Sequence, residues 1–205
     1  VGAGDNATVL HYIKNRDKIV DGDMVLIDAA TEYEMYAADI TRTFPANGKF
    51  SDAQKDIYSV VLKAQKAVVD AAKPGVTFQE LHDLDLRLLV EGMVEIGLLS
   101  GDPDEIIKDE TYQDYFMHKT GHWLGLDVHD MGKYMVDGDS IKLEPGMVFT
   151  IEPGIYVNSK SEAPKKFKGI GVRIEDDILI TETGNKNLTA AVPKEIAEIE
   201  SLMAH

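Results

Sequence analysis

The chain has 205 residues, of which 44 % are hydrophobic and 28 % charged, a composition typical of a soluble globular protein of one or two domains. Its net charge of −15 leaves no basic face for phosphate groups, so we expect no nucleic-acid partner. No apolar run approaches the roughly 18 residues of a membrane span, and the absence of cysteine and of a signal-peptide pattern favours a cytoplasmic protein without disulfides.

Two long helices are expected in the first half of the chain. Each follows a capping box, in which a Ser or Thr precedes a Gln or Glu by three residues: Ser51 with Gln54, and Thr77 with Glu80. The apolar residues recur at helical spacing over 53–72 and again from 78 to about residue 99. The acidic stretch SGDPDE, 100–105, is expected to be a loop.

The remaining segments have the pattern of strands, and several are apolar on both alternating faces, as strands covered on both sides must be. A long polar loop over 158–169 separates the last two of them. The expected strands are 23–30, 34–44, 121–129, 146–157 and 169–181.

An internal duplication relates two of these segments. The sequence GDMVLIDA from Gly22 parallels GMVFTIEP from Gly146, and this alignment superimposes Asp28 on Glu152. Each unit continues through a turn into a second strand that carries another acid. We therefore expect two related units of antiparallel strands with helices between them.

The duplication predicts paired carboxylates. If the first unit is a hairpin that turns near Tyr33 and Glu34, Asp28 faces Asp39 across the strand pair, with Cβ atoms about 4.5–5.5 Å apart. If the second unit turns in the middle of its polar loop, Glu152 faces Glu175 in the same way. Four carboxylates among apolar neighbours would be costly to bury as anions without a compensating cation.

Two kinds of cation could compensate these acids. Arg42 and Arg173 could form salt bridges, but two divalent metals about 3.5–4 Å apart would use several bridging oxygens at once. The stretch FMHKTGHWLGLDVHD adds three histidines, of which His118 and His122 share one face of a strand. His129 reaches that face only if the glycines bend the strand. One imidazole nitrogen among carboxylate oxygens suits manganese, cobalt, iron or zinc better than magnesium or calcium.

With these acids and histidines in order, the sequence resembles the catalytic domain of the pita-bread metallopeptidases (family M24), which include methionine aminopeptidases, prolidases, Xaa-Pro aminopeptidases and the metal-free creatinases. The similarity runs from about residue 1 to 203 and is densest in IDAATEYEMYAADITRTFP, HKTGHWLGLDVHD, EPGMVFTIEPGIYV and GIGVRIEDDILIT. It implies an α+β, pita-bread fold: a pseudo-two-fold repeat of antiparallel strands with helices covering the outside. HWLGLDVHD and the AVPKEIAEIE tail look like bacterial Xaa-Pro aminopeptidases or prolidases.

The resemblance also implies roles for individual residues. Arg173 would steady the carboxylates, and Asp39 and Glu175 would bridge two metal ions. The implied metal ligands are Asp28, Asp39, His122, Glu152 and Glu175. The implied substrate contacts are His11, His118, His129 and Tyr156.

We accordingly expect a metal-dependent aminopeptidase that hydrolyses the bond between an N-terminal residue and proline by means of a hydroxide bridging two divalent ions. Manganese is the expected metal, with cobalt, zinc and iron as alternatives. Glu152 is the expected general base, and His129, helped by His118, stabilises the oxyanion or protonates the leaving nitrogen. The expected substrates are peptides with proline in second position.

One departure concerns the start of the chain. Family members carry an N-terminal domain and begin the catalytic domain with helices ahead of VGAGDNATVLHY, and neither is present in this chain. We expect residues 1–205 to be one catalytic domain, truncated on its N-terminal side, of a full-length protein that is a homo-oligomer. Whether the fragment alone is active stays open, as do two rival functions: a dipeptidase restricted to Xaa-Pro, and a non-catalytic module that binds peptides or proteins.

Overall fold

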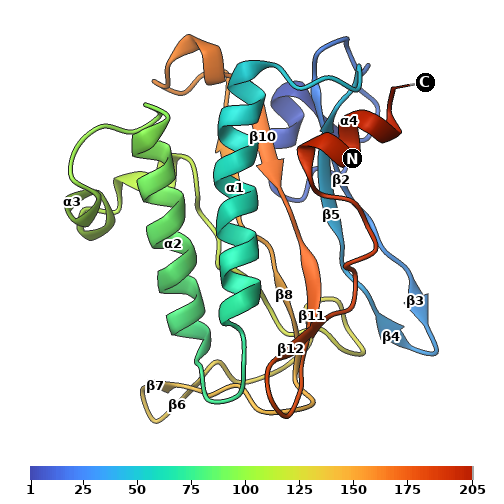
Figure 1. Cartoon of the computed structure of the whole chain (residues 1–205), viewed down its shortest axis with the longest axis vertical. Coiled ribbons are helices and arrows are strands. Elements are labelled where there is room, and N and C mark those ends of the chain that lie inside the picture. The colour runs from blue at the N-terminus through green and yellow to red at the C-terminus, as the bar shows by residue number, and fades with distance from the viewer. Residues whose placement is uncertain (205) are drawn as a thin grey trace.

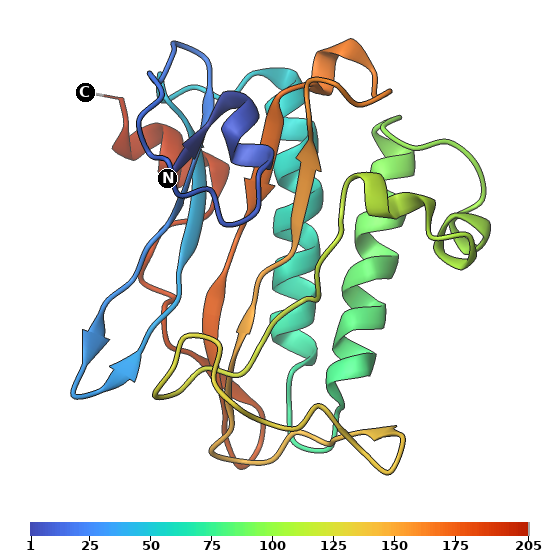
Figure 2. The same cartoon turned by 180° about the vertical axis from the view of Figure 1, so that it is seen from behind.

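Two long helices lie side by side against one face of the strands in the computed structural model, which describes residues 1–204 (Figure 1). Figure 2 shows the strands from the opposite side, with the helices behind them. The α-helices are α1 (Asp52–Ala71), α2 (Phe78–Glu95), α3 (Pro103–Lys108) and α4 (Ile196–Leu202). Short 3-10 turns occupy Gly4–Thr8, Thr111–Asp114 and Lys165–Phe167.

Both predicted capping boxes are present, at Ser51 before α1 and at Thr77 before α2. Helix α2 ends at Glu95, earlier than predicted, because Gly97 adopts a left-handed conformation (φ +76°) that reverses the chain. The prediction of a loop over 100–105 is confirmed for 100–102 and wrong for 103–105, which are helical. Asp102 accepts a hydrogen bond from the backbone N–H of Asp104, and the proline at position 103 starts α3 at the first helical position.

All strand pairs are antiparallel, as the sequence predicted. They form sheets in the orders β1–β2–β5, β9–β10 and β8–β11–β12, with small hairpins β3–β4 and β6–β7. The strands are β1 (Gly2–Ala3), β2 (Met24–Asp28), β3 (Glu32–Tyr33), β4 (Tyr36–Ala37), β5 (Thr41–Pro45), β6 (Met135–Val136), β7 (Asp139–Ser140), β8 (Val148–Ile151), β9 (Gly154–Val157), β10 (Ile170–Arg173), β11 (Asp176–Ile180) and β12 (Asn185–Asn187).

The strand predicted over 121–129 is not formed. Residues next to Trp123 donate to or accept from the backbone of β8, but they form only an isolated bridge, between Trp123 and Phe149. The Trp123 carbonyl then accepts a hydrogen bond from the backbone N–H of Asp130 at 3.0 Å. The chain therefore folds back on itself between these two residues. The apolar pattern of this segment comes from side chains that pack in a loop.

The two predicted units are visible in the backbone. β2 and β8 begin two residues after Gly22 and Gly146, which both have a left-handed φ, +86° and +92°. The predicted strands 146–157 and 169–181 are each interrupted once, at 152–153 and at 174–175. The chain thus passes from the β8–β11–β12 sheet into the β9–β10 sheet between β8 and β9, and returns between β10 and β11. Glu152 and Glu175 lie at these two breaks.

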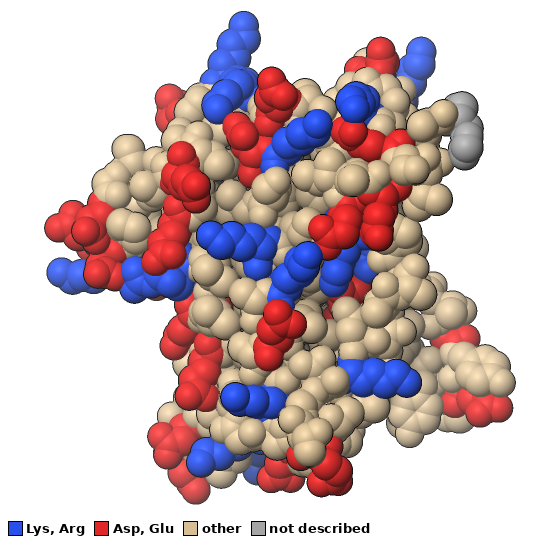
Figure 3. Space-filling model, viewed as in Figure 1, with Lys and Arg blue, Asp and Glu red and all other residues tan. Residues whose placement is uncertain are grey.

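The core lies between the helices and the strands of the second unit. One buried cluster joins α1 and α2 to β9 and β10. Another joins the C-terminal end of α1 and the N-terminal end of α2 to β8 and β11, around Trp123 and Phe149. On the helix side, basic side chains are interspersed with acidic ones over the surface (Figure 3). Within residues 1–204, no helix is long and apolar enough to cross a membrane.

Candidate metal centre

Asp28 and Asp39 come from the first unit, at the end of β2 and just before β5. The predicted register is wrong by two residues, because Asp28 pairs with Thr41 and not with Asp39. The hairpin turns at Glu34 and Met35, which both have positive φ, as a two-residue type I′ turn requires. A shift of two residues preserves the face, so Asp28 and Asp39 still line the same cavity.

Glu152 and Glu175 come from the second unit, and here the predicted register is confirmed. Arg173 pairs with Gly154 on one side of the break and Asp176 with Ile151 on the other. The residues between these two ladders, Glu152 and Glu175, therefore lie opposite each other.

His122 brings the two units together. Its Nε2 lies 3.4 Å from Asp39 Oδ2, 3.5 Å from Glu152 Oε1 and 4.0 Å from Glu175 Oε1. Its Nδ1 lies 2.9 Å from the Trp123 carbonyl oxygen, which can only accept a hydrogen bond. In the neutral imidazole the proton is therefore on Nδ1, and Nε2 presents its lone pair to the carboxylates, the arrangement of a metal-ligating histidine.

The buried acids of this cluster are unfavourable as anions unless a cation lies beside them. Burial raises the pKa of Glu175 well above its usual range, and the charges of Glu152 and Asp39 raise it further. Burial also raises the pKa of Glu152. Burial lowers the pKa of His122, but its hydrogen bond to Asp39 and the nearby acids outweigh this and raise it.

Ligand atoms of Asp39, His122 and Glu175 all lie within 4.8 Å of one another. Carboxylate oxygens with one imidazole nitrogen are the donors that divalent transition metals take, and a divalent cation would offset the unfavourable charges of the buried acids. The residues present therefore fit a divalent metal site.

Asp28 stands slightly apart from this cluster. Its Oδ2 accepts a hydrogen bond from Arg173 Nη2 at 2.6 Å, and its side chain is 40 % exposed. The same guanidinium is within 4.0 Å of Glu152 and 3.9 Å of Glu175. Arg173, which is buried, is thus the cation that the chain itself provides to three of the four acids.

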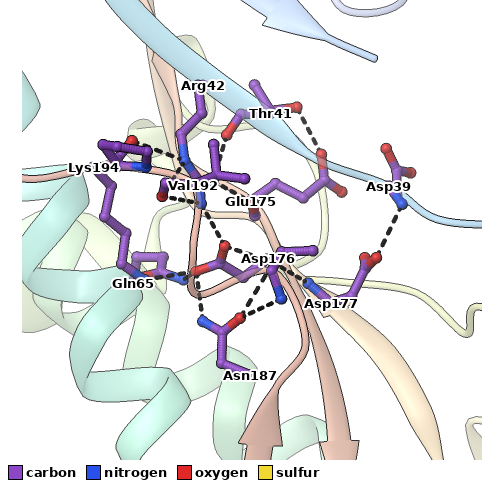
Figure 4. Close-up of polar contacts among 12 residues, drawn as sticks. Asp39, Thr41, Arg42, Gln65, Glu175, Asp176, Asp177, Asn187, Val192 and Lys194 are labelled. Atoms are coloured by element: carbon purple, nitrogen blue, oxygen red, sulfur yellow. Dashed lines mark hydrogen bonds and ion pairs between the residues drawn. The ribbon is translucent and has the colours of Figure 1, made fainter. Parts of the chain in front are cut away.

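A second polar network supports the centre from behind (Figure 4). Thr41 Oγ1 donates to Glu175 Oε2 at 2.6 Å, and Asp177 Oδ2 accepts the backbone N–H of Asp39 at 3.2 Å. Asp176 is buried and lies 2.7 Å from Arg42 Nη2, so Arg42 compensates an acid behind the site and not the predicted metal ligands. Burial opposes ionisation of Asp176, but the nearby cations Arg42 and Lys194 outweigh it and lower its pKa to about 2.

Three of the four predicted substrate-contacting residues reach the same place, whereas Tyr156 is buried and does not line the cavity. His11, His118 and His129 line a cavity of about 240 Å³ together with the acids. His129 packs against His122, with ring centroids 4.3 Å apart, because the loop that follows Trp123 turns its ring back. Burial lowers the pKa of His129, as does the neighbouring His122.

His118 is held by two hydrogen bonds. Its Nδ1 lies 2.7 Å from the Lys119 carbonyl oxygen and its Nε2 lies 2.8 Å from Tyr156 Oη. Arg173 Nη1 donates to the same Tyr156 oxygen at 3.2 Å, so the Tyr156 proton is directed at His118 Nε2. Burial raises the pKa of Tyr156 to about 12 and lowers that of His118 to about 4, so both are neutral near pH 7.

A larger cavity of about 520 Å³ adjoins the first, and Lys119, Gly121 and His122 line both. Its other walls are mostly apolar and include Phe78 and Phe149. The segment 119–122 thus separates the acidic cavity from an apolar one.

Three residues near the centre were not predicted: Thr41, Asp85 and Thr120. The hydroxyls gave no signal in the sequence. Asp85 did give one, because it lies four residues from both Leu81 and Leu89, on the apolar face of the predicted helix. An acid at such a position is buried unless the helix is exposed all round, and Asp85 is indeed fully buried.

The chain matches the model of metallopeptidase family M24 over residues 1–182. The Xaa-Pro aminopeptidase of Haemophilus influenzae is 55 % identical over 203 residues, which are 99 % of this chain and 47 % of that protein. The Xaa-Pro aminopeptidase of Escherichia coli is 52 % identical over 203 residues, covering 99 % and 46 %. The chain therefore spans about half the length of the curated relatives it matches.

Solved structures agree. Pseudomonas aeruginosa aminopeptidase PepP superimposes with a TM-score of 0.98 at 53 % identity, over 100 % of this chain and 46 % of that one. Zinc-substituted Escherichia coli aminopeptidase P, in complex with product, superimposes with a TM-score of 0.96 at 52 % identity, over 99 % and 46 %. These likenesses confirm the predicted pita-bread fold.

Proposed function

The chain belongs to metallopeptidase family M24, and we propose that it is the catalytic domain of an aminopeptidase that hydrolyses the bond between an N-terminal residue and proline. One observation carries this proposal: Asp39, His122 and Glu175 converge from three distant parts of the sequence with their ligand atoms within 4.8 Å. The names and the 52–55 % identity of the two Xaa-Pro aminopeptidases support the substrate class. We treat residues 1–205 as one domain of a longer enzyme.

We propose that two divalent ions occupy the centre, with manganese as the native metal. An oxygen-rich set with a single imidazole supports this choice, since manganese accepts carboxylates more readily than softer metals do. The ligands would be Asp28, Asp39, His122, Glu152 and Glu175. Such ions supply an activated water and polarise the scissile carbonyl.

Glu152 is our candidate general base. Its raised pKa suits a carboxylate that accepts a proton near neutral pH and passes it on. Thr150 Oγ1 donates to Glu152 Oε1 at 3.3 Å, which leaves the other carboxylate oxygen for proton transfer.

His129 is our candidate for the group that contacts the scissile carbonyl and protonates the leaving nitrogen. Among residues 1–204, neither of its ring nitrogens has a hydrogen-bond partner, and its ring is exposed to the cavity beside His122. An imidazole with a free donor at this place can stabilise a developing oxyanion.

The role proposed for His118 is narrower than the sequence suggested. Both ring nitrogens are engaged, by Lys119 and by Tyr156, so His118 is poorly suited to exchange protons with a substrate. We propose that it orients Tyr156 and Arg173 and forms one wall of the substrate cavity. His11 forms another wall.

Proline in second position removes the N–H of the scissile amide, so a site can select it by shape and not by hydrogen bonding. We propose peptides of three or more residues as substrates. We also propose that the full-length protein acts in the cytoplasm, which the lack of cysteine supports. That it does so as a homo-oligomer is implied only by the family resemblance, and light scattering of the full-length protein tests it.

The experiment is metal analysis combined with peptide hydrolysis. The full-length protein, loaded with Mn²⁺ and desalted, should contain about two ions per chain, cleave Ala-Pro-Ala and leave Ala-Ala-Ala intact. Asp39→Asn should fold, lose metal and lose turnover. Cleavage of Ala-Pro alone would identify a dipeptidase, and a folded, metal-free, inactive parent would favour the binding module.

A further inference from the structure

Asp85 is a buried acid that the proposed mechanism does not use. It lies on α2 with no exposed surface, and its Oδ2 accepts a hydrogen bond from Thr120 Oγ1 at 2.7 Å. Its Oδ1 is also buried and has no hydrogen-bond partner within residues 1–204. A buried carboxyl group with an unsatisfied oxygen destabilises the folded state, more so if it is charged, whereas leucine at this place would carry no such penalty. The position therefore serves a purpose other than packing.

Thr120, the partner of Asp85, belongs to the segment that carries His122. The Thr120 carbonyl accepts the backbone N–H of Glu152 at 2.7 Å. Two residues on, the His122 carbonyl accepts the Thr150 N–H at 2.9 Å, and the His122 N–H donates to Thr150 Oγ1 at 3.1 Å. The segment 120–122 is thus hydrogen-bonded on one side to β8 and to Glu152, which directly follows it.

Gly121, the residue between Thr120 and His122, allows the segment to approach the backbone of Thr150 closely. A Cβ atom at position 121 would lie 1.8 Å from the Thr150 carbonyl oxygen, so no side chain fits there. The segment consequently has no side chain of its own to hold it at its middle. Its position depends on the hydrogen bonds at Thr120 and His122.

On the opposite side, the Thr120 side chain connects the segment to α2 through two groups. Its hydroxyl donates to Asp85, and His82 Nδ1 lies 2.9 Å from the same oxygen. His82 and Asp85 are three residues apart and so share a face of the helix. A hydroxyl that donates to one and accepts from the other is fixed in rotation, and it fixes the backbone of Thr120 with it.

We propose that Asp85 is a positioning residue: through the Thr120 hydroxyl it holds the segment of His122 against β8 and Glu152 and so sets the distance between the metal ligands His122 and Glu152. Asp85 touches neither ligand. The proposal rests on the proposed function, because it assumes that His122 and Glu152 bind metal. Removing groups that orient metal ligands typically costs about 10- to 100-fold in metal affinity or activity.

The test uses four variants of the full-length protein. Thr120→Val keeps the shape of the side chain and removes the hydrogen bond, and Asp85→Leu removes it with a branched apolar side chain of larger volume. Thr120→Ser and Asp85→Asn keep the hydrogen bond. Gln54→Leu is the control, because Gln54 is a buried polar residue on α1 whose side chain donates to the Gly22 carbonyl, away from the centre. The measurements are the Kd of Mn²⁺, kcat and KM for Ala-Pro-Ala, and the thermal midpoint.

We expect Thr120→Val and Asp85→Leu to weaken Mn²⁺ binding and lower kcat by about 10- to 100-fold with little change in KM. Thr120→Ser and Asp85→Asn should stay close to the parent in Mn²⁺ affinity, kcat and KM. Gln54→Leu should lower only the thermal midpoint. If Asp85→Leu fails to fold, the Thr120 pair decides.

Parent-like Mn²⁺ affinity and kcat in folded Thr120→Val would overturn the proposal, as would a loss in Thr120→Ser equal to that in Thr120→Val. A parent that binds Mn²⁺ but cleaves no peptide would refute only the proposed function, and the Kd series would still test Asp85. An active parent with indifferent variants would refute only the positioning role. A parent that binds no Mn²⁺ would refute both.

Discussion

The guanidinium of Arg173 donates to the carboxylate of Asp28 at 2.6 Å and approaches Glu152 and Glu175 within 4.0 Å. One buried cation of the chain therefore compensates three of the acids implied to bind metal. Arg173 and a bound metal ion would both offset the negative charge of these acids. Metal binding should therefore compensate part of the stability that is lost when Arg173 is removed.

The first prediction concerns Arg173→Gln. The metal-free variant should lose roughly 3–5 kcal/mol of unfolding free energy, because breaking a buried ion pair leaves an uncompensated charge. Mn²⁺ should restore much of this loss. Urea unfolding with and without Mn²⁺ measures both effects. Arg87→Gln, which removes a half-exposed arginine 2.6 Å from Asp104, is the control and should cost less than about 1 kcal/mol. Equal losses in the two variants would contradict the role given to Arg173.

The second prediction is that Glu175→Gln stabilises the metal-free protein while abolishing metal binding. The raised pKa of Glu175, caused first by burial, means that the folded state disfavours its anion. Below the usual carboxyl pKa near 4.5 the group costs nothing, and its cost appears as the pH rises through the raised value. The amide removes this cost and can still accept the hydrogen bond of Thr41. Thermal midpoints at pH 7.5 should rise without metal and stop responding to Mn²⁺. A fall in the metal-free midpoint would contradict this.

The third prediction concerns the pH dependence of metal binding. Glu152 and Glu175 have raised pKa values and must lose their protons to coordinate a cation, so binding should release protons and tighten as the pH rises from about 5 toward neutrality. Calorimetry of Mn²⁺ binding in two buffers of different ionisation enthalpy counts the protons. Glu152→Gln should release fewer of them. Binding that weakens with rising pH would show that these pKa shifts are not those of the metal-free centre.

The sequence predicted those parts of the fold that depend on neighbouring residues. The capping boxes at Ser51 and Thr77 act over three residues, and both formed. The register at Glu152 and Glu175 could be predicted because both acids sit in matching strands around one loop. The register at Asp28 could not, since it depends on which two residues adopt positive φ, and Glu34 with Met35 is not a typical pair for that turn.

The candidate site was predicted in composition better than in geometry. Its acids and histidines could be found because each stands in a distinctive motif. The loop that turns His129 toward His122 could not be foreseen, because it depends on the fold-back hydrogen bond from Asp130 to Trp123. The contact of Thr120 with Asp85 joins residues 35 positions apart, and nothing local to either residue indicates it.

The fourth prediction tests how closely the segment of His122 must pack. Gly121→Ala would force its Cβ into the Thr150 carbonyl, so the hydrogen bonds between His122 and Thr150 must break. We expect loss of Mn²⁺ binding and a clearly lower thermal midpoint. Gly184→Ala is the matched control, because a Cβ there meets nothing within 4 Å. Metal affinity in Gly121→Ala equal to that of the control would contradict the packing described.

The fifth prediction concerns the state of His118. Its hydrogen bonds to Lys119 and Tyr156 place the proton on Nδ1, and burial lowers its pKa to about 4. Nitrogen NMR should find this tautomer, uncharged, from pH 5 to 8. Tyr156→Phe should free Nε2 and change its shift, while the shift of the His82 ring, which is hydrogen-bonded to Thr120 and not to Tyr156, stays constant. A His118 ring that becomes charged near pH 6.5 would contradict the arrangement.

The four acids and the one imidazole of the centre are spread over the chain from Asp28 to Glu175, and both long helices lie between the two units in the sequence. Pairings between such distant positions form late, because the intervening chain must be ordered before they gain anything. During synthesis the cavity cannot be completed until Glu175 has emerged, well after α1 and α2 are free to form. Binding of the divalent metal should thus occur in the last stage of folding. A nascent chain on a ribosome stalled before Glu175 should bind no metal at this centre.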